Sequence, residues 1–196
     1  MSELSFRPVS ASVTILKELM VPAYANFGGK VHGGVILGLM DKIAYTAAAT
    51  HARTYCVTAS INRVDFLNSV DVGDLLTLHA SVNYVARSSM EVGIRVESEN
   101  FRAGRTKHTN TSYFTMVAMD EGDGKIQVPG LILETRDDAR RFVEGQLRRG
   151  SHRTQGEILR KLRSHADLGA EITALQSTTY CLTDDLRASL ERTPPA

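Results

Sequence analysis

The sequence has little of several residue types that mark particular classes of protein. Among its 196 residues there are two cysteines, Cys56 and Cys181, and no tryptophan. Two distant cysteines build neither a disulfide framework nor a typical metal site, so we expect free thiols and no metal. Cys56 falls in a β-rich stretch and should be packed there. The composition, with 42% hydrophobic and 23% charged residues, is typical of a globular protein, and the length allows one compact domain with an appendage.

An excess of charge of one sign and a long hydrophobic run are also missing. The formal net charge is +1, which gives no reason to expect binding to nucleic acid. No segment reaches about 18 uncharged apolar residues, so we expect no insertion into a membrane. The first ten residues, MSELSFRPVS, contain no apolar signal core, which favours a cytoplasmic location.

The most informative stretch runs from residue 26 to residue 50, where a glycine-rich loop leads into an apolar helix that carries one acid, Asp41. Between Val35 and Ala49 nearly every side chain is apolar, which indicates a helix buried on most sides. An ionised carboxylate in such a place shifts its pKa or finds partners, and acids of this kind concentrate at functional sites. Asp41 is therefore either a group that does chemistry or a residue at an edge.

The chain around this helix reads mainly as strands. Residues 13–21 fit a strand, although a short helix is also compatible. Alternating or β-rich patterns then follow over residues 55–66, 75–86, 89–101 and 106–120. Hairpin-length turns join them without a second helix, so we predict an α+β domain in which an antiparallel sheet wraps one helix. Such a sheet leaves a face or an edge open, and pairing with a second copy would cover it.

The composition changes after Glu134. Residues 134–165 hold nine Lys or Arg against five acids. Gly145, Gly150 and Gly156 interrupt the segment, and we predict a helix that is broken at these glycines. It is either a solvated appendage or an arm that faces phosphate or another subunit. An amphipathic run from Leu168 to Leu190 follows, and its role is open.

Several motifs in order resemble the acyl-CoA thioesterases of the hotdog fold. The resemblance is to the branch of small bacterial acyl-CoA hydrolases and of the cytosolic long-chain acyl-CoA hydrolases of animals. Its motifs are Asn26, GGKVHGG, the helix with Asp41, Thr58, VDVGD at 70–74, ARSS at 86–89 and YFTMVAMD at 113–120. This implies a hotdog domain over residues 10–133, and the change in composition then marks a basic helical extension over 134–165 and a C-terminal extension over 166–196. It also implies a homodimer, assembled as a trimer of dimers, with catalysis at the dimer interface.

Carried over residue by residue, the resemblance gives Asp41 the place of the catalytic carboxylate and Asn26 that of its polar partner on the facing subunit. A carboxylate can act as the general base for water that attacks a thioester, and an amide can orient the water or the thioester. The amides of Gly33 and Gly34 start the helix and are candidate oxyanion donors. The Thr58 hydroxyl would hold water near the acid of a partner chain.

Each of these residues also has a plain structural interpretation. Asp41 can be a satisfied structural acid near Lys42 or a strand hydroxyl, Asn26 a loop or cap residue and Thr58 a cross-strand residue without a role. Gly33 and Gly34 can serve a tight turn and close packing. His32 is kept outside the catalytic set, because a lone histidine is more often structural.

Arg87, Ser88 and Ser89 match the family's short Arg-Ser stretch between strands and are the first candidates for contacts to coenzyme A phosphates. The chain departs from the family pattern at Ala86, where glycine is usual, and the same stretch also fits a plain hairpin tip. Lys107, His108 or the segment 134–165 are further candidates for the 3′-phosphate. Coenzyme A belongs to the substrate, and no separate cofactor is expected.

The activity implied is hydrolysis of fatty acyl-CoA to a free fatty acid and coenzyme A. The alternative, which is a binding protein and not an enzyme, is a non-catalytic acyl-CoA-binding hotdog module with a regulatory role. A hotdog dehydratase fits less well, since no Asp and His pair stands at the expected spacing in the helix-entry motif. Acyl-chain length depends on a tunnel that sequence alone does not place.

Overall fold

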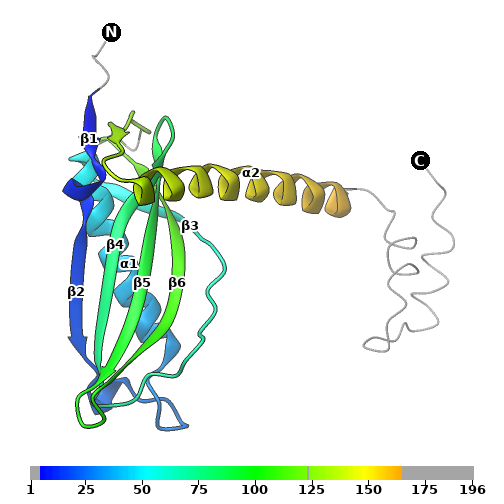
Figure 1. Cartoon of the computed structure of the whole chain (residues 1–196). Coiled ribbons are helices and arrows are strands. Elements are labelled where there is room, and N and C mark those ends of the chain that lie inside the picture. Colours follow the sequence, from blue (N-terminus) through cyan, green and yellow to red (C-terminus); the bar gives the residue numbers. More distant parts are fainter. Residues whose placement is uncertain (1–4, 123, 165–196) are drawn as a thin grey trace, which may run out of the picture. The chain divides into compact units, whose positions relative to one another are not determined.

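The computed structural model describes residues 5–122 and 124–164 of the chain. By its internal contacts the chain divides into two compact units, residues 1–146 and 147–196. In the first unit a curved sheet wraps one long helix (Figure 1). This is the predicted α+β hotdog arrangement, with a helical extension after it.

The elements follow one another along the chain in a simple order. They are β1 (Phe6–Pro8), the 3₁₀ helix η1 (Val9–Ser12), β2 (Thr14–Leu19), the 3₁₀ helix η2 (Pro22–Tyr24), α1 (Gly33–Ala52), β3 (Cys56–Ile61), β4 (Leu75–Val85), β5 (Ser89–Asn100), β6 (Arg105–Ala118), β7 (Gly130–Ile132) and α2 (Arg136–Ser164). The strand predicted within residues 13–21 and the four later strands are therefore confirmed.

The main sheet is antiparallel, with strand order β2-β4-β5-β6-β3. β3 is an edge strand and stops at Ile61, short of the predicted end at residue 66. Residues 62–69 instead run beside β6 as a strap without regular pairing. Two backbone bonds hold the strap there, from Asn62 N to the Tyr113 carbonyl at 2.9 Å and from Leu67 N to the Thr109 carbonyl at 2.9 Å.

The core lies between α1 and the concave face of the sheet. Alternate residues of β4, β5 and β6, such as Leu78, Val92 and Phe114, are fully buried against the helix. They meet the inner side of α1, which includes Met40 and Ile43. Burying one such side chain contributes about 1.5–3 kcal/mol. The core thus fixes both the axial position and the rotation of α1.

The outer side of α1 corrects the expectation of a helix buried on most sides. Six of its residues are exposed and form one stripe: Gly34, Gly38, Asp41, Lys42, Tyr45 and Thr46. Their spacing of three or four residues places them on one helix face. Apolar composition suggested burial, but four of the six positions on this face are glycine or carry a charged side chain.

A second, small sheet was not predicted. β1 and β7 pair in parallel, with Phe6 opposite Gly130, although more than a hundred residues separate them in the sequence. Near this sheet, Arg7 donates to the carbonyls of Thr50 and His51 at 2.9 and 3.0 Å, which ties down the last turn of α1. The helix then ends at Ala52, and its C-cap residue Arg53 has a left-handed backbone with φ 57°.

The segment predicted to be broken helix is one continuous helix, α2. Glycine weakens a helix by about 1 kcal/mol relative to alanine but does not interrupt it. Ion pairs one turn apart support this helix, such as Arg140 to Glu144 at 2.7 Å. Gly145 has a packing role, because a Cβ there would lie 2.6 Å from the Cβ of Tyr84. None of the described helices has the length and apolarity needed to cross a membrane.

Candidate functional site

Asp41 lies on the exposed face of α1 and is held by Thr58. The Thr58 hydroxyl donates to the Asp41 carboxylate at 2.6 Å, within the same chain. The prediction that Thr58 would lie near the acid of a partner chain is therefore wrong. β3 begins at Cys56, just after α1 ends at Ala52, so it runs back beside the helix that precedes it. A charge-assisted bond of this length fixes the carboxylate's orientation.

An open cavity of about 520 Å³ surrounds this pair. Its lining residues are Asp41, Lys42, Tyr45, Thr46, Tyr55, Cys56, Val57 and Thr58. The rings of Tyr45 and Tyr55 stand 6.2 Å apart and form an aromatic wall. These two tyrosines were missed from the sequence, although Tyr45 follows Asp41 by four residues and so shares its helix face.

Cys56 lines the same cavity but is a poor nucleophile. It is confirmed as a buried free thiol. Burial raises the pKa of the Cys56 thiol to about 11. Because the thiolate is the reactive form of cysteine, Cys56 stays protonated at neutral pH. Asp41 is the carboxylate that lines this cavity.

Asn26 lies in a tight loop that leads to α1. Its side-chain oxygen accepts from the backbone amides of Gly28 at 2.9 Å and Lys30 at 3.1 Å. Gly29 adopts the positive φ of 74° that closes this turn. Since the amide oxygen is already used twice, the Nδ2 group is the part of Asn26 available to a ligand. It can donate a hydrogen bond but not accept one.

The start of α1 places the two candidate oxyanion amides in different situations. His32 is the N-cap, and its Nδ1 accepts from the Gly34 amide at 2.9 Å. Gly33 N–H is the first amide of the helix and has no acceptor inside it. Gly33 also packs under Phe66, whose ring would lie 3.5 Å from a Cβ at this position. Gly33 is the freer donor, and His32 has the structural role expected for it.

Gly33 does not share one reaction centre with Asp41 of the same chain, and Asn26 lies in the loop before Gly33. Asp41 follows Gly33 by eight residues, which corresponds to about 12 Å along the helix. Both would need to reach within about 3 Å of the same carbonyl group to act on it together. A single chain thus presents two half-sites, one at each of these positions.

The predicted coenzyme A contacts form the hairpin tip between β4 and β5. The Arg87 carbonyl accepts from Val128 N and the Ser88 carbonyl accepts from Ala118 N, both at 3.0 Å, which fixes the backbone. The Arg87 side chain is exposed. Ser89 pairs with Val117, which pairs with Val57 of the Asp41 cavity. Two strand spacings, about 10 Å, therefore separate the hairpin from that cavity.

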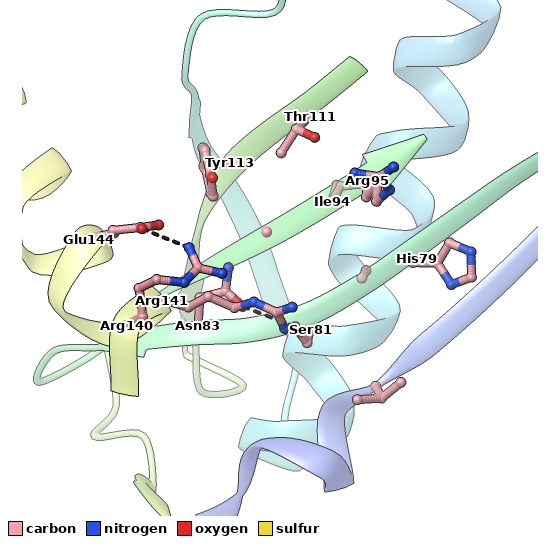
Figure 2. Close-up of a pocket in the computed structure, with 13 residues that line it drawn as sticks. His79, Ser81, Asn83, Ile94, Arg95, Thr111, Tyr113, Arg140, Arg141 and Glu144 are labelled. Atoms are coloured by element: carbon pink, nitrogen blue, oxygen red, sulfur yellow. Dashed lines mark hydrogen bonds and ion pairs between the residues drawn. The ribbon is translucent and has the colours of Figure 1, made fainter. Parts of the chain in front are cut away.

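A second cavity, of about 330 Å³, lies on the other face of the sheet. Figure 2 shows its side chains converging from β4, β5, β6 and the first turns of α2. Arg140 pairs with Glu144, and Arg95 pairs with Glu97 at 2.9 Å. Lys107, another candidate for the 3′-phosphate, pairs with Asp71. The sheet separates this cavity from Asp41, so it does not extend the site described above.

Comparison with known proteins places the chain in a family. Residues 28–103 match the model of the thioesterase superfamily. The protein VdlD of Helicobacter pylori is 42% identical over 144 residues, which are 74% of this chain and 82% of that protein. The chain belongs to the hotdog acyl-CoA thioesterase family. Another member, the acyl-CoA thioester hydrolase YkhA of Bacillus subtilis, is 35% identical over 60% of this chain and 68% of its own length. The human cytosolic acyl coenzyme A thioester hydrolase is 32% identical over 70% of this chain but only 37% of its own length.

Solved structures of this thioesterase family have the same fold. An apo-hexameric acyl-CoA thioesterase superposes with a TM-score of 0.75 at 37% identity, covering 78% of this chain and 97% of that one. An acyl-CoA hydrolase of Staphylococcus aureus, solved with butyryl coenzyme A and coenzyme A, gives 0.72 at 27% identity, covering 82% and 99%. Its alanine variants replace an asparagine, an aspartate and a threonine spaced 15 and 17 residues apart. Asn26, Asp41 and Thr58 have the same spacing.

Proposed function

We propose that this protein hydrolyses fatty acyl-CoA to a free fatty acid and coenzyme A, in the cytoplasm. The observation that carries the proposal is Asp41, an exposed carboxylate held at 2.6 Å by Thr58 beside an open, partly aromatic cavity. Membership of a family of acyl-CoA thioester hydrolases supports it. Asp41 acts as the general base, taking a proton from the water that attacks the thioester carbonyl.

The oxyanion that forms on the carbonyl needs donors at the opposite side. Gly33 N–H and Asn26 Nδ2 supply them, because the helix dipole and both N–H groups favour negative charge there. Gly34 N–H can join only by leaving the His32 ring. Asn26 positions the thioester rather than the water, since its oxygen is taken by its own loop. Collapse of the intermediate then breaks the C–S bond and expels the coenzyme A thiolate, which takes up the proton that Asp41 removed from the water.

The two half-sites come together in a homodimer. Gly33 lies about 12 Å from Asp41 along α1, and Asn26 lies in the loop before that helix, so the complementary half-site comes from a second copy. The exposed edge of β3 and the exposed stripe of α1 are the surfaces left open for it. The hexamer seen in a related structure supports a trimer of such dimers.

The hairpin at Arg87, Ser88 and Ser89 binds coenzyme A phosphates in this proposal. It lies two strand spacings from the Asp41 cavity and presents an exposed guanidinium on a fixed backbone. Arginine pairs well with phosphate because its N–H groups match the phosphate oxygens. The acyl group then lies toward Tyr45 and Tyr55, the apolar part of the cavity.

The base is tested by thiol release from acyl-CoAs of increasing chain length. Asp41→Asn keeps the shape of the side chain but removes the base, and we expect kcat to fall about 10²–10⁴-fold. Glu121→Gln, an equivalent change at an exposed turn residue, is the control and should match wild type. Equal rates for Asp41→Asn and wild type would contradict the role of Asp41. Tight acyl-CoA binding without turnover by wild type would favour the non-catalytic module.

The composite site is tested by mixing two inactive variants. Asn26→Ala and Asp41→Asn each damage both sites of a homodimer, but a heterodimer of the two has one intact site and one doubly damaged site. Random pairing of equal amounts should restore about one quarter of wild-type activity, because half the dimers are mixed and half their sites are intact. No recovery in mixtures shown to contain heterodimer would mean that each site belongs to one chain.

A further inference from the structure

An irregularity in β4 shapes the second cavity, on the face of the sheet that points away from α1. β4 pairs with β5 in regular register from Leu75 to Val82, and the register then shifts between Val82 and Tyr84. Asn83 is the extra residue of this bulge, and it lines the cavity. Bulges re-aim side chains and are frequent beside binding sites. The next residue, Tyr84, packs its ring 5.0 Å from that of Phe142 on α2, which closes this end of the cavity.

Gly93 of β5 makes room for the Asn83 side chain on the cavity floor. A Cβ at Gly93 would lie 2.1 Å from Asn83 Nδ2, so a larger residue would displace the amide. Asn83 is only 5% exposed, and its Oδ1 accepts from the Ser81 hydroxyl at 3.0 Å. Among the residues that the structure describes, Nδ2 has no acceptor. Buried donors are nearly always satisfied, so this N–H group points to a ligand that accepts from it.

Positively charged side chains surround this floor. Figure 2 shows Arg140 and Arg141 extending from the first turns of α2 beside Asn83, with Arg95 further along β5. Within the described part of the chain, the cavity is lined by these three guanidinium groups and by one carboxylate, that of Glu144. The lining therefore carries more positive than negative charge, and a cavity of this kind concentrates anions.

Arg141 is the guanidinium that is best placed to bind an anion. The carboxylate paired with it, that of Asp137, lies 3.9 Å away, which is too far for a hydrogen bond. Asp137 also stands outside the cavity lining. Arg140 is held more closely, by Glu144 at 2.7 Å and by Asp137 at 3.4 Å. The Arg141 fork thus keeps N–H groups for a ligand, beside the donor of Asn83.

We propose that this cavity binds a small anion that carries a phosphate group, at a site separate from the one that contains Asp41. A phosphate group has a charge of about −1.5 to −2 at neutral pH and three acceptor oxygens. It can accept from the Arg141 fork and from Asn83 Nδ2 together, whereas a carboxylate has one charge and two oxygens. The volume of about 330 Å³ is at the lower end for small-molecule sites. It suits inorganic phosphate, pyrophosphate or a small phosphate ester.

Calorimetric titration of the full chain with inorganic phosphate, pyrophosphate and glycerol 3-phosphate tests the site. Potassium chloride at the same ionic strength is the reference, because salt alone screens exposed charges. We expect saturable binding, which Arg141→Gln should weaken roughly 10–150-fold by removing charge-assisted hydrogen bonds. Arg136→Gln is the matched control. Arg136 is the first residue of α2 and stands outside the cavity lining, so its Kd should equal that of wild type.

Asn83→Asp tests the cavity floor independently. Its carboxylate can still accept from the Ser81 hydroxyl, but it places an acceptor and a negative charge where Nδ2 lies. Phosphate binding should be lost while circular dichroism stays native. If this buried variant does not fold, Arg141→Gln still decides, because Arg141 is partly exposed.

The three titrants also identify the source of the phosphate group. Binding of pyrophosphate alone would assign the site to a diphosphate, and equal binding of glycerol 3-phosphate would assign it to a phosphate monoester. The inference is overturned if Arg141→Gln binds as tightly as wild type, or if no titrant binds more than chloride does at millimolar concentration. Because the titration requires no turnover, a protein that binds phosphate but hydrolyses no acyl-CoA would refute the proposed function and leave this site in place.

Discussion

The two sides of helix α1 differ in what completes them. On the inner side, Ile36, Met40 and Ile43 are at most 2% exposed, and every neighbour they need comes from the same chain. On the outer side, Gly34, Gly38 and Asp41 are exposed. The inner side makes the fold, and the outer side holds groups to which the proposed function assigns a ligand or a second chain. The residues that stabilise the fold and those assigned to the proposed function thus lie on opposite faces of one helix.

This separation has an energetic basis. Large apolar side chains on the inner side supply hydrophobic stabilisation, which needs no precise orientation. In the proposed reaction Asp41 is a general base, which needs access to water and a fixed direction, and Thr58 supplies that direction through its hydrogen bond to the carboxylate. Substitutions on the inner side should therefore change the free energy of unfolding, whereas substitutions on the outer side should change turnover.

The largest expected effect on stability is that of Ile43→Ala. Ile43 is 1% exposed and packs between α1 and the sheet, so truncation removes apolar contacts and leaves a cavity. We expect the free energy of unfolding to fall by about 2–5 kcal/mol, measured by urea denaturation. Below the unfolding transition, kcat of the remaining folded protein should stay near wild type.

Thr46→Ala is the matched control for Ile43→Ala, since Thr46 is exposed on the same helix and its hydroxyl bonds only to the Lys42 carbonyl, at 2.9 Å. Its unfolding free energy should stay within about 0.5 kcal/mol of wild type. The contrast between the two helix sides breaks down if both variants lose similar stability, or if Ile43→Ala lowers kcat without lowering stability.

A smaller effect, on turnover alone, is expected for Thr58→Val. The substitution keeps the shape of the side chain and removes the hydroxyl that donates to Asp41. A hydrogen bond to a charged group is worth about 1.5–3 kcal/mol, which corresponds to a fall in kcat of roughly 10–150-fold. Thr58→Ser retains the hydroxyl and should keep most of the activity. If Val and Ser variants have the same kcat, Thr58 does not orient the base.

Much of this fold could be predicted because its signals are local. The alternation of Val92, Ile94 and Val96 with polar residues shows which face of β5 is buried, and hairpin turns give the antiparallel order. The parallel pairing of β1 with β7 was not predicted, because the two strands have three residues each and lie far apart in the sequence. No local pattern encodes such a pairing.

The site was predicted less completely, for two physical reasons. Apolar composition was read as burial for Asp41, although the positions of Gly34, Gly38 and Lys42 relative to it already mark an open helix face. The partner of Thr58 was assigned to another chain, because sequence does not show that β3 turns back along α1. The bond from His32 to the Gly34 amide likewise depends on a ring orientation that only coordinates supply.

The smallest expected effect is on the free energy of unfolding at acidic pH. It concerns His51, on the buried side of α1 near the C-terminal end of the helix. His51 is fully buried, with Nε2 bonded to the Pro129 carbonyl at 3.0 Å and Arg7 close by. Burial lowers the pKa of His51. The hydrogen bond to the Pro129 carbonyl raises this pKa in part, and the Arg7 charge lowers it further. The unfolded chain binds a proton below about pH 6.5, whereas the native state binds it only at lower pH. The stability contributed by neutral His51 is therefore present above about pH 6.5 and lost as pH falls below it.

His51→Gln isolates this effect, because its amide can still donate to the Pro129 carbonyl but does not titrate. Between pH 7.5 and 5.5, wild type should lose up to about 1.4 kcal/mol more unfolding free energy than the variant, since one pH unit below the unfolded pKa corresponds to that amount. Urea denaturation at both pH values measures the difference. A wild-type pH dependence equal to that of His51→Gln would show that His51 takes up its proton in the native state, and that this end of the inner side is as open to solvent as the side that carries Asp41.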